Sequence, residues 1–594
     1  MAKGRLTDDE VIERPFNSRQ FLRLMSYLKP YKIKLLAAFG LMITAALCSL
    51  SGPYFIKLII DNYISKNSLS GIQWIILAFM SASGIGALCF RYRVRLMEVT
   101  GRKAIAQLRQ DLFDHIQSLS FTFFDGRPAG KIMVRVINDV NSLLGLFTDG
   151  IINVIIDCIT IFIVLGLMFT ISAKLTLISI CTLPFMILIV FKLKRTIRVR
   201  WQKVRQKVSN MNAYLHESLS GVRVTQAFVR EEKNEQTYNG LNTDIKQSWM
   251  KAIMMNNVFW PSLDIVSAIG TCLVYFFGIR WLKSDGVTIG SLMAILWYQG
   301  RFWDPLNSLS NFYNNILIAM ASTERIFEIM DTPADIQDTL TAIEMPQIQG
   351  RVEFDHVTFS YDREKAVLKD VSFIVEPGET IALVGPTGAG KSTIINLISR
   401  FYDTKEGTIL IDGYDVKNVN MNSMRSQMGV MLQDTFIFSG TIADNIRYGK
   451  LNATDDEIIE AAKAVNAHEF ITQMEKGYQT EVNERGSRLS VGQKQLIAFA
   501  RALLADPRIL ILDEATSSID THTEILIQRA LERLLKGRTS FVIAHRLSTI
   551  RKADRIMAID DGRIMESGSH DELIQAKGIY YNLVQAQYRF LKAV

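Results

Sequence analysis

A glycine-rich string in the last third of the chain has residue types that bind phosphate groups. The apolar stretch 381–384 precedes it, and an apolar run begins near Ser392. A strand, a glycine-rich loop and a helix in this order bring backbone N–H groups together around phosphate oxygens. Lys391 adds a positive charge at the β- and γ-phosphates, and the Ser392 hydroxyl is a ligand for Mg²⁺. The residues expected to surround the phosphates are Gly385, Thr387, Gly388, Gly390, Lys391 and Ser392.

Two carboxylates follow a second apolar run. Residues 509–512 read Ile-Leu-Ile-Leu, and Asp513 and Glu514 come directly after them. At the tip of a buried strand, Asp513 can hold Mg²⁺ through water, and Glu514 can act as the base that polarises an attacking water. Downstream of a phosphate loop in the same domain, this pair predicts a nucleotide-hydrolysing site.

Three further side chains complete the predicted site. His545 follows the apolar stretch 540–544, so it lies at the carboxyl end of a predicted strand, where it can contact the γ-phosphate. Gln433 follows the stretch 430–432 and can ligate Mg²⁺. Tyr361 is a candidate for stacking on adenine. The predicted catalytic residues are Glu514, His545 and Gln433, and the predicted metal ligands are Ser392, Gln433 and Asp513.

A second phosphate-binding end is predicted at residues 489–493, which read Leu-Ser-Val-Gly-Gln. Ser490, Gly492 and Gln493 begin a helix whose N-terminus can face a γ-phosphate. Because the first loop already supplies one such end to its own nucleotide, the second end needs another nucleotide. We therefore expect it to cap a nucleotide bound to another copy or to a partner chain.

The apolar residues of the chain are concentrated before about residue 320. Hydrophobic residues make up 48% of the 594, and the formal net charge is +8. Lys and Arg flank the apolar runs, which is typical of cytoplasmic loops rather than of a nucleic-acid surface. Six runs of about 20 residues could cross a bilayer as helices. They lie near residues 35–56, 73–93, 151–171, 173–193, 258–281 and 289–320.

This distribution predicts an α-helical polytopic membrane domain at 1–332, a linker at 333–350 and an α/β nucleotide-binding domain at 351–594. The long basic connections 91–150 and 193–257 should be cytoplasmic, as should the N-terminus. They are rich in helix formers, so we expect the membrane helices to continue as rods that turn near 121–125 and 214–217.

The membrane part also contains polar residues. The sixth run includes Gln299 and Arg301, and the third and fifth runs include Asp157 and Asp264. Such groups favour a water-filled cavity or contact with a cationic cargo, and helix–helix hydrogen bonding is the alternative.

Together and in this order, the strings resemble those of ABC transporters of the exporter type, in which six membrane spans precede one ATP-binding cassette. The resemblance implies that ATP and Mg²⁺ are the cofactors, that Thr393 belongs to the phosphate loop, and that Asp520 ends the D-loop at 517–520. It also implies a dimer, in which each nucleotide lies between the phosphate loop of one cassette and the signature residues 489–493 of the other.

One residue departs from the family pattern. The family usually has Gly where this chain has Val491. An altered signature beside the intact Glu514, His545 and Gln433 resembles one subunit of a bacterial heterodimeric multidrug exporter, and a homodimer is the alternative.

The resulting hypothesis is ATP-driven export of amphipathic drugs or lipid-like molecules across the cytoplasmic membrane by alternating access. A homodimeric lipid flippase shares every motif, and an importer with the exporter fold and an ATP-gated channel stay open. The six predicted spans exclude soluble cassette proteins of translation or DNA repair.

Overall fold

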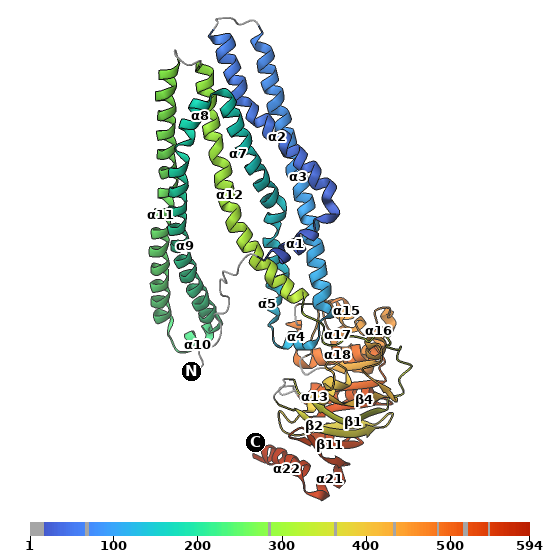
Figure 1. Ribbon diagram of the computed structural model, residues 1–594. Helices are drawn as coiled ribbons and strands as arrows, with labels where there is room; N and C mark the ends of the chain where they lie inside the picture. Colours follow the sequence, from blue (N-terminus) through green and yellow to red (C-terminus); the bar gives the residue numbers. More distant parts are fainter. Residues whose placement is uncertain are drawn as a thin grey trace. The chain divides into compact units, whose positions relative to one another are not determined.

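The computed structural model describes residues 17–65, 71–282, 287–361, 365–431, 435–483, 486–514, 521–544 and 547–593. The chain forms two compact units (Figure 1). One consists of Met1–Ile116 and Gly130–Thr332, and the other of Gln117–Ala129 and Pro333–Val594. The short segment Gln117–Ala129 therefore packs with the second unit, although its neighbours in sequence belong to the first.

Long helices build the first unit. Within the described residues, five helical stretches are long and apolar enough to cross a membrane: Lys29–Ile64, Ile72–Ser118, Ala129–Ile171, Ala173–Ser220 and Glu231–Trp281. The main helices are α1 (Ser18–Ser26), α2 (Lys32–Ile59), α3 (Ile72–Ser118), α5 (Ala129–Val134), α6 (Val140–Ser142), α7 (Ile151–Ile171), α8 (Ala173–Ile180), α9 (Leu183–Ser220), α10 (Val222–Ala227), α11 (Glu231–Trp281) and α12 (Ile289–Met330).

The predicted span 173–193 is confirmed as part of the apolar stretch Ala173–Ser220 but is not one continuous helix, and the predicted span 289–320 is not among the five stretches. The run 173–193 is divided between α8 and α9, which begins with Pro184 in its first turn. The run 289–320 lies in the continuous helix α12, but α12 is not among the five apolar stretches. Gln299, Arg301 and several asparagines make it more polar than the others. Its passage through the membrane stays a prediction.

The helices extend far beyond their apolar segments, as predicted. α3 has 47 residues, α9 has 38 and α11 has 51. One turn lies at α4 (Phe121–Asp125), as expected. The other expected turn, at 214–217, is wrong because those residues continue α9, and the chain turns at Gly221 and α10. Tyr214 donates a hydrogen bond to the Asn234 side chain and so joins α9 to α11 instead.

Two acidic side chains fix α12 near its two ends. At the start, Asp61 accepts hydrogen bonds from the Thr288 hydroxyl at 2.7 Å and from the Gly290 N–H at 2.9 Å. Towards the other end, the buried Asp139 accepts a 2.6 Å hydrogen bond from Arg325 Nη2. All of these contacts join residues of the first unit, so they hold α12 within that unit.

The second unit is an α/β domain, and three sheets are found in the described part of it. Its main sheet has the strand order β12-β11-β3-β10-β9-β6, with β11, β3, β10, β9 and β6 parallel and β12 antiparallel at the edge. An antiparallel sheet with the order β2-β1-β4-β5 and a small pair, β7-β8, accompany it.

The strands are β1 (Val352–Phe359), β2 (Leu368–Val375), β3 (Thr380–Val384), β4 (Glu406–Ile411), β5 (Tyr414–Asp415), β6 (Met428–Met431), β7 (Gly440–Thr441), β8 (Glu481–Val482), β9 (Ile509–Glu514), β10 (Thr539–Ala544), β11 (Arg555–Asp560) and β12 (Arg563–Gly568). The helices of this unit, besides α4, are α13 (Lys391–Ile398), α14 (Met421–Arg425), α15 (Ile442–Arg447), α16 (Asp455–Ala464), α17 (His468–Thr472), α18 (Val491–Leu504), α19 (Thr521–Leu535), α20 (Leu547–Arg551), α21 (His570–Ala576) and α22 (Ile579–Ala593).

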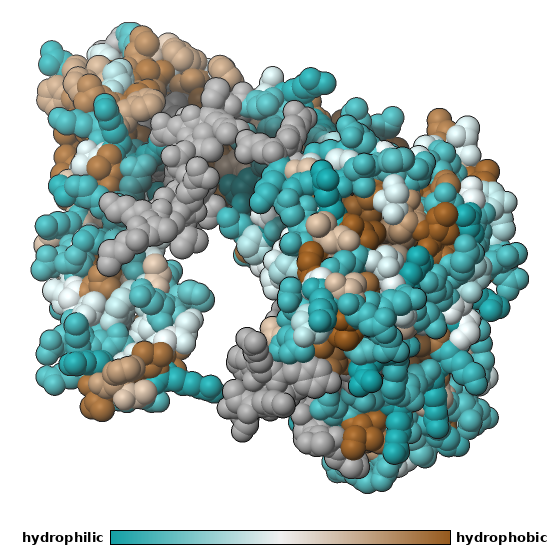
Figure 2. All heavy atoms as spheres, turned by 90° about the horizontal axis from the view of Figure 1, so that it is seen from below, coloured by the Kyte–Doolittle hydropathy of each residue, from teal (hydrophilic) through white to brown (hydrophobic). Residues whose placement is uncertain are grey.

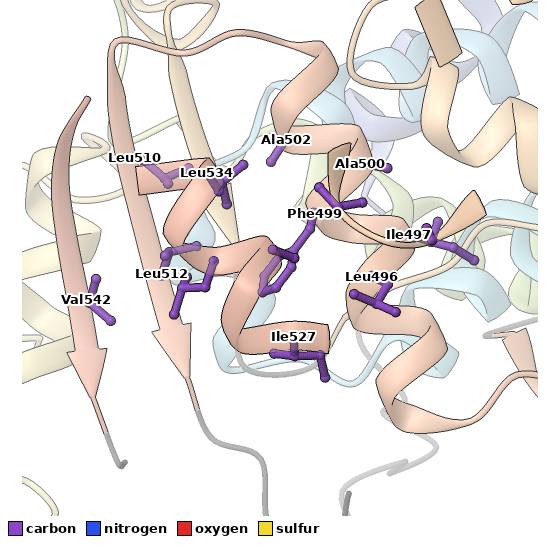
Figure 3. Packing of buried hydrophobic residues seen from close by; sticks show 14 of the residues in the cluster. Leu496, Ile497, Phe499, Ala500, Ala502, Leu510, Leu512, Ile527, Leu534 and Val542 are labelled. Carbon is purple, nitrogen blue, oxygen red and sulfur yellow. The ribbon is translucent and has the colours of Figure 1, made fainter. Parts of the chain in front are cut away.

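A buried apolar cluster holds α18 and α19 against the main sheet. Leu496 and Phe499 of α18 lie beside Leu512 of β9 and Ile527 of α19 (Figure 3). Packing of this kind fixes the helix positions to within small displacements, because protein interiors are close-packed.

The surface seen in Figure 2 is mostly hydrophilic, with separate apolar patches.

The predicted linker at 333–350 has no helix or extended strand, but side-chain contacts hold it to the rest of the second unit. The Arg400 side chain, which is 2% exposed, lies within 3.4 Å of the Asp338 carboxylate and within 3.3 Å of that of Asp403. It also donates to the carbonyls of Gln337 and Val419. One buried guanidinium therefore joins the linker to the segments after α13 and before α14.

Substituting Arg400→Met should destabilise this unit by about 3–5 kcal/mol, because two carboxylates would lose their buried positive partner. Thermal unfolding and limited proteolysis of the full chain would measure the effect, with faster cleavage expected in 333–350. Arg351→Met is the matched control, since Arg351 is exposed where it pairs with Glu353 and should change stability by less than about 1 kcal/mol. Equal effects of the two substitutions would contradict the role of Arg400.

Candidate functional site

The glycine-rich loop has the backbone that its sequence predicts. It leaves β3 at Gly385 and enters α13 at Lys391, with Gly390 at the N-cap. Gly390 has φ +108° and Gly385 has φ +150°. A Cβ atom at Gly385 would lie 2.1 Å from the Ile559 carbonyl oxygen, so a larger residue would displace either β11 or the loop. The loop is thus held close to the sheet edge, with Thr387, Gly388 and Ser392 exposed.

Lys391 extends back over this loop. Its ammonium group donates hydrogen bonds to the carbonyls of Gly385 and Pro386, both at 2.8 Å. Burial lowers the pKa of Lys391, and the nearby carboxylate of Asp513 opposes that shift. A buried ammonium above a curved loop of backbone N–H groups is an arrangement suited to a polyphosphate.

Strand register brings the acidic pair to the same edge of the sheet. Asp513 of β9 pairs with Ile543 of β10, and Ile543 pairs with Leu383 of β3. The glycine-rich loop begins two residues after Leu383. Since neighbouring strands lie about 4.8 Å apart, Asp513 and the loop are about two strand spacings from each other along this edge. In open parallel sheets this edge is where ligands bind.

Four of the predicted residues cannot be placed by their side chains. Glu514 is the last residue of β9 and pairs with Ala544, so its backbone lies at the same edge, but its side chain is not among those described. Gln433, Asp520 and His545 lie outside the described residues. The strands that precede Gln433 and His545, β6 and β10, both end at this edge of the sheet.

Tyr361 lies beside the first turn of α13. Its hydroxyl is 3.2 Å from the Thr393 hydroxyl, and its ring packs edge-on against Phe359 and Tyr402 at centroid distances of 5.0 Å. Tyr361 is 43% exposed, which is compatible with contact between its ring and a planar group. The structure therefore places an open aromatic ring next to the phosphate-type loop.

The signature residues form the start of α18. The Ser490 hydroxyl accepts a hydrogen bond from the Gln493 N–H at 3.2 Å, and the Gln493 side chain accepts one from the Ser490 N–H at 2.9 Å. Such a reciprocal capping box stabilises a helix start. Gln493, which the sequence suggests as a nucleotide contact, has a structural role here. Val491 is 55% exposed at the first helical position.

The residues present fit a nucleotide with a magnesium ion. Mg²⁺ binds few protein ligands and completes its octahedron with water and phosphate oxygens. The described residues contain no group of three or more His, Cys, Asp or Glu side chains that could hold a metal ion. Ser392 and Asp513 are the described residues that could contribute.

The sequence did not predict the contact between α4 and the segment that follows α13. The Tyr402 hydroxyl donates a hydrogen bond to the Asp125 carboxylate of α4, and the Phe401 ring lies 4.4 Å from that of Phe121. The only sequence signal was an aromatic pair, Phe401 and Tyr402, just after the helix that follows the phosphate loop.

Comparison with known families and proteins agrees with this architecture. Residues 35–306 match the family model of the ABC transporter transmembrane region, and residues 368–517 match the family model described as ABC transporter. A solved structure of a bacterial Atm1-family ABC exporter with ATP bound is similar, with a TM-score of 0.76 and 28% identity, covering 94% of this chain and 98% of that one.

Bacterial relatives are similar over nearly their whole length. An uncharacterized ABC transporter ATP-binding protein of Bacillus subtilis, YknV, is 47% identical over 587 residues, which are 98% of this chain and 97% of the relative. A putative multidrug export ATP-binding/permease protein of Staphylococcus aureus is 38% identical, with 95% and 99% covered. An ATP-dependent lipid A-core flippase of Syntrophus aciditrophicus is 36% identical, with 96% and 94% covered.

Proposed function

Because this chain belongs to the ABC transporter family and fuses a transmembrane region to one ATP-binding cassette, we propose that it is one half of a dimeric exporter that uses ATP hydrolysis to move amphipathic molecules out across the bacterial cytoplasmic membrane. The observation that carries the proposal is the combination of five apolar helical stretches with a glycine-rich loop, a buried lysine and an acidic strand end in one chain.

The residues of the cassette have distinct roles in this proposal. The loop from Gly385 to Thr393 and the Lys391 ammonium bind the phosphates, and Tyr361 stacks on the base. Ser392, Asp513 and Gln433 hold Mg²⁺, which neutralises phosphate charge when bound. Glu514 takes the proton of the attacking water, and His545 orients the γ-phosphate. Asp520, Ser490, Gly492 and Gln493 face the nucleotide of the partner cassette.

Closure of two cassettes around ATP gives a reason for the long helices. A helix transmits a displacement along its length because its backbone hydrogen bonds are all internal. α3, α9 and α11 each continue well beyond the residues needed to cross a bilayer. Nucleotide-driven closure at the cytoplasmic side would thereby turn the membrane helices from inward- to outward-facing.

Val491 favours a heterodimer. At the first position of α18 the backbone is helical, so Val strains nothing there. Its effect must come from bulk beside the helix N-terminus, where a phosphate of the partner's nucleotide would approach. A chain that keeps Glu514 supplies a complete phosphate loop and base to its own nucleotide. With the bulkier Val491 it caps the partner's nucleotide less closely.

Substituting Val491→Gly should therefore raise hydrolysis at the site that this residue caps, by about 2- to 10-fold, if the bulk opposes closure by about 0.5–1.4 kcal/mol. Phosphate release by the purified dimer measures it, with Val222→Gly on the exposed helix α10 as a control for loss of a surface valine. Unchanged or lower hydrolysis would contradict this account of Val491.

The cargo class rests on composition and on the relatives. The polar and aromatic residues of α12 suit an amphipathic molecule, and one relative is named as a multidrug exporter. A lipid flippase is the second candidate, because another relative of nearly the same length is named as one.

Purification of the chain alone and with its candidate partner tests the proposal. We expect cargo-stimulated ATP hydrolysis from one of the two preparations in lipid vesicles, together with efflux of a fluorescent amphipathic dye. Movement of a labelled lipid without dye transport would favour the flippase. Neither activity in either preparation would contradict an exporter.

A further inference from the structure

One side of helix α9 changes from apolar to cationic within a single helical turn. Phe185, Leu188 and Phe191 are 66%, 64% and 75% exposed. Lys192 and Arg195 come next on the same side, because residues three or four positions apart share one side of a helix, and both are exposed. The residues 185, 188, 191, 192 and 195, here called the α9 strip, thus place exposed aromatic and aliphatic groups directly before two positive charges.

The opposite side of α9 packs on α11, and the two helices run side by side (Figure 1). Met186 of α9 is buried in one cluster with Phe259 and Leu263 of α11, and Leu193 packs against this cluster. None of the residues of the α9 strip belongs to it. The contact with α11 therefore leaves the α9 strip open to a ligand.

The charge around the strip is strongly positive. Residues 192–207 have Lys or Arg at eight positions and no Asp or Glu. The stretch 245–263 of α11, which runs alongside, has two lysines and no acidic residue. Lys207, at the far end of the basic stretch, pairs with Asp244 of α11. A concentration of one sign of charge attracts a ligand of the opposite sign, so an anion is favoured beside Lys192 and Arg195.

A tryptophan of α11 lies at the same level as the change from apolar to cationic residues. The Lys194 ammonium is 5.8 Å from the centre of the Phe259 ring. The next residue, Trp260, is 56% exposed, and its ring packs against that of Phe259. Exposed tryptophans are enriched at the headgroup level of membrane proteins. The end of the apolar part of the α9 strip therefore coincides with the expected headgroup level.

We propose that the α9 strip binds an anionic phospholipid of the surrounding bilayer. The acyl chain lies along Phe185, Leu188 and Phe191, and the headgroup phosphate accepts hydrogen bonds from Lys192 and Arg195. A zwitterionic lipid also has a phosphate, but its own positive group is repelled by the basic stretch. The ligand is a resident lipid and not a cargo, so the inference goes beyond the proposed function and does not depend on the direction of transport.

The basic stretch supplies its own control. Lys203 and Arg205 are exposed and lie about three turns after Lys192 and two turns after Arg198, on the same side of α9. Along the helix axis they are about 16–20 Å from Lys192. The headgroup layer is only about 5–8 Å thick on each side of a bilayer, and salt screens charges beyond about 10 Å. Lys203 and Arg205 should therefore contribute little to lipid binding.

Photochemical cross-linking tests the proposal on the full-length dimer in phosphatidylcholine vesicles. The probes are phosphatidylglycerol and phosphatidylcholine, each with a diazirine on one acyl chain. Adducts on residues 185–191 are counted by mass spectrometry. Phosphatidylglycerol should give about 25-fold more adduct than phosphatidylcholine, because each nearby Lys or Arg contributes about 5-fold in affinity for an anionic lipid.

Three double variants complete the experiment. Lys192→Gln with Arg195→Gln should bring the ratio of the two adducts close to one. Lys192→Arg with Arg195→Lys keeps both charges and should keep the wild-type ratio. Lys203→Gln with Arg205→Gln is the matched control and should also keep it. ATP hydrolysis in pure phosphatidylcholine vesicles, where no anionic lipid is present, should be the same for all of them and confirms that each variant folds.

A ratio close to one in the wild type would overturn the inference, because it would mean that the α9 strip does not select the headgroup or is covered in the dimer. An equal loss in the Lys203 and Arg205 control would also overturn it, since total charge and not position would then decide binding. Addition of Mg²⁺-ATP separates a resident lipid from a cargo. Unchanged adduct during hydrolysis supports the proposal, whereas loss of adduct together with movement of the lipid to the opposite leaflet would overturn it.

Discussion

Substituting Glu514→Gln is expected to slow ATP hydrolysis by about 100- to 10,000-fold while ATP still binds. Gln has the shape of Glu but cannot accept the proton of the attacking water. β9 ends at Glu514 beside Ala544 of β10, at the edge where the glycine-rich loop begins, so the substitution should change chemistry without displacing the loop. Phosphate release and nucleotide binding by the full dimer in nanodiscs measure the two effects separately.

Glu406→Gln provides the matched control, because it removes an exposed carboxylate from β4 of the same unit. Its hydrolysis rate should equal that of the wild type. If Glu514→Gln retained near-normal turnover, Glu514 could not be the base. If it lost nucleotide binding as well, the carboxylate would be needed for the site's structure rather than for the reaction.

The phosphate loop could be predicted from sequence because its geometry is local. Gly385 and Gly390 adopt positive φ values within a few residues of each other. The strand before them and the helix after them are the only other elements needed to identify a phosphate loop. The parallel direction of β3, β10 and β9 agrees with the predicted α/β class, because alternating strands and helices favour a parallel sheet. The predicted fold class and family are therefore confirmed.

Contacts between distant segments could not be predicted in the same way. Asp125 and Tyr402 are 277 positions apart, and nothing in either local sequence names the other. The position of the turn after α9 was wrong for a related reason. Residues 214–217 continue α9, which runs to Ser220, and Tyr214 bonds to Asn234 of α11, 20 positions further along the chain.

Residue type alone does not reveal the capping contact that Gln493 makes. A glutamine beside a predicted phosphate-binding helix end suggests a ligand contact, but at the third helical position its side chain caps the helix through the Ser490 N–H. Two uses of the same residue at the same spacing cannot be separated without the backbone. The capping box also holds the Ser490 oxygen in place at the helix start, which leaves its hydroxyl proton as the group that could reach a partner's phosphate.

Substituting Lys391→Ala should differ from Glu514→Gln in its main effect, because it should weaken ATP binding, whereas Glu514→Gln should slow hydrolysis of ATP that still binds. The Lys391 ammonium is buried above the loop and is held by two backbone carbonyls at 2.8 Å. Losing a buried charge that faces phosphate costs about 2–5 kcal/mol, or roughly 30-fold to several thousand-fold in ATP affinity. Equilibrium binding of Mg²⁺-ATP to the full dimer measures this loss.

Lys369→Ala is the matched control for Lys391→Ala, since Lys369 pairs at 2.7 Å with the exposed Asp561. This control should bind ATP within about 3-fold of the wild type, the most that a surface ion pair contributes. The two variants are most informative together. Tight ATP binding without hydrolysis in Glu514→Gln, and weak ATP binding in Lys391→Ala, would assign Glu514 to the hydrolysis step and Lys391 to the binding step. Wild-type ATP affinity in Lys391→Ala would mean that the backbone N–H groups of the loop hold the phosphates without help from the ammonium.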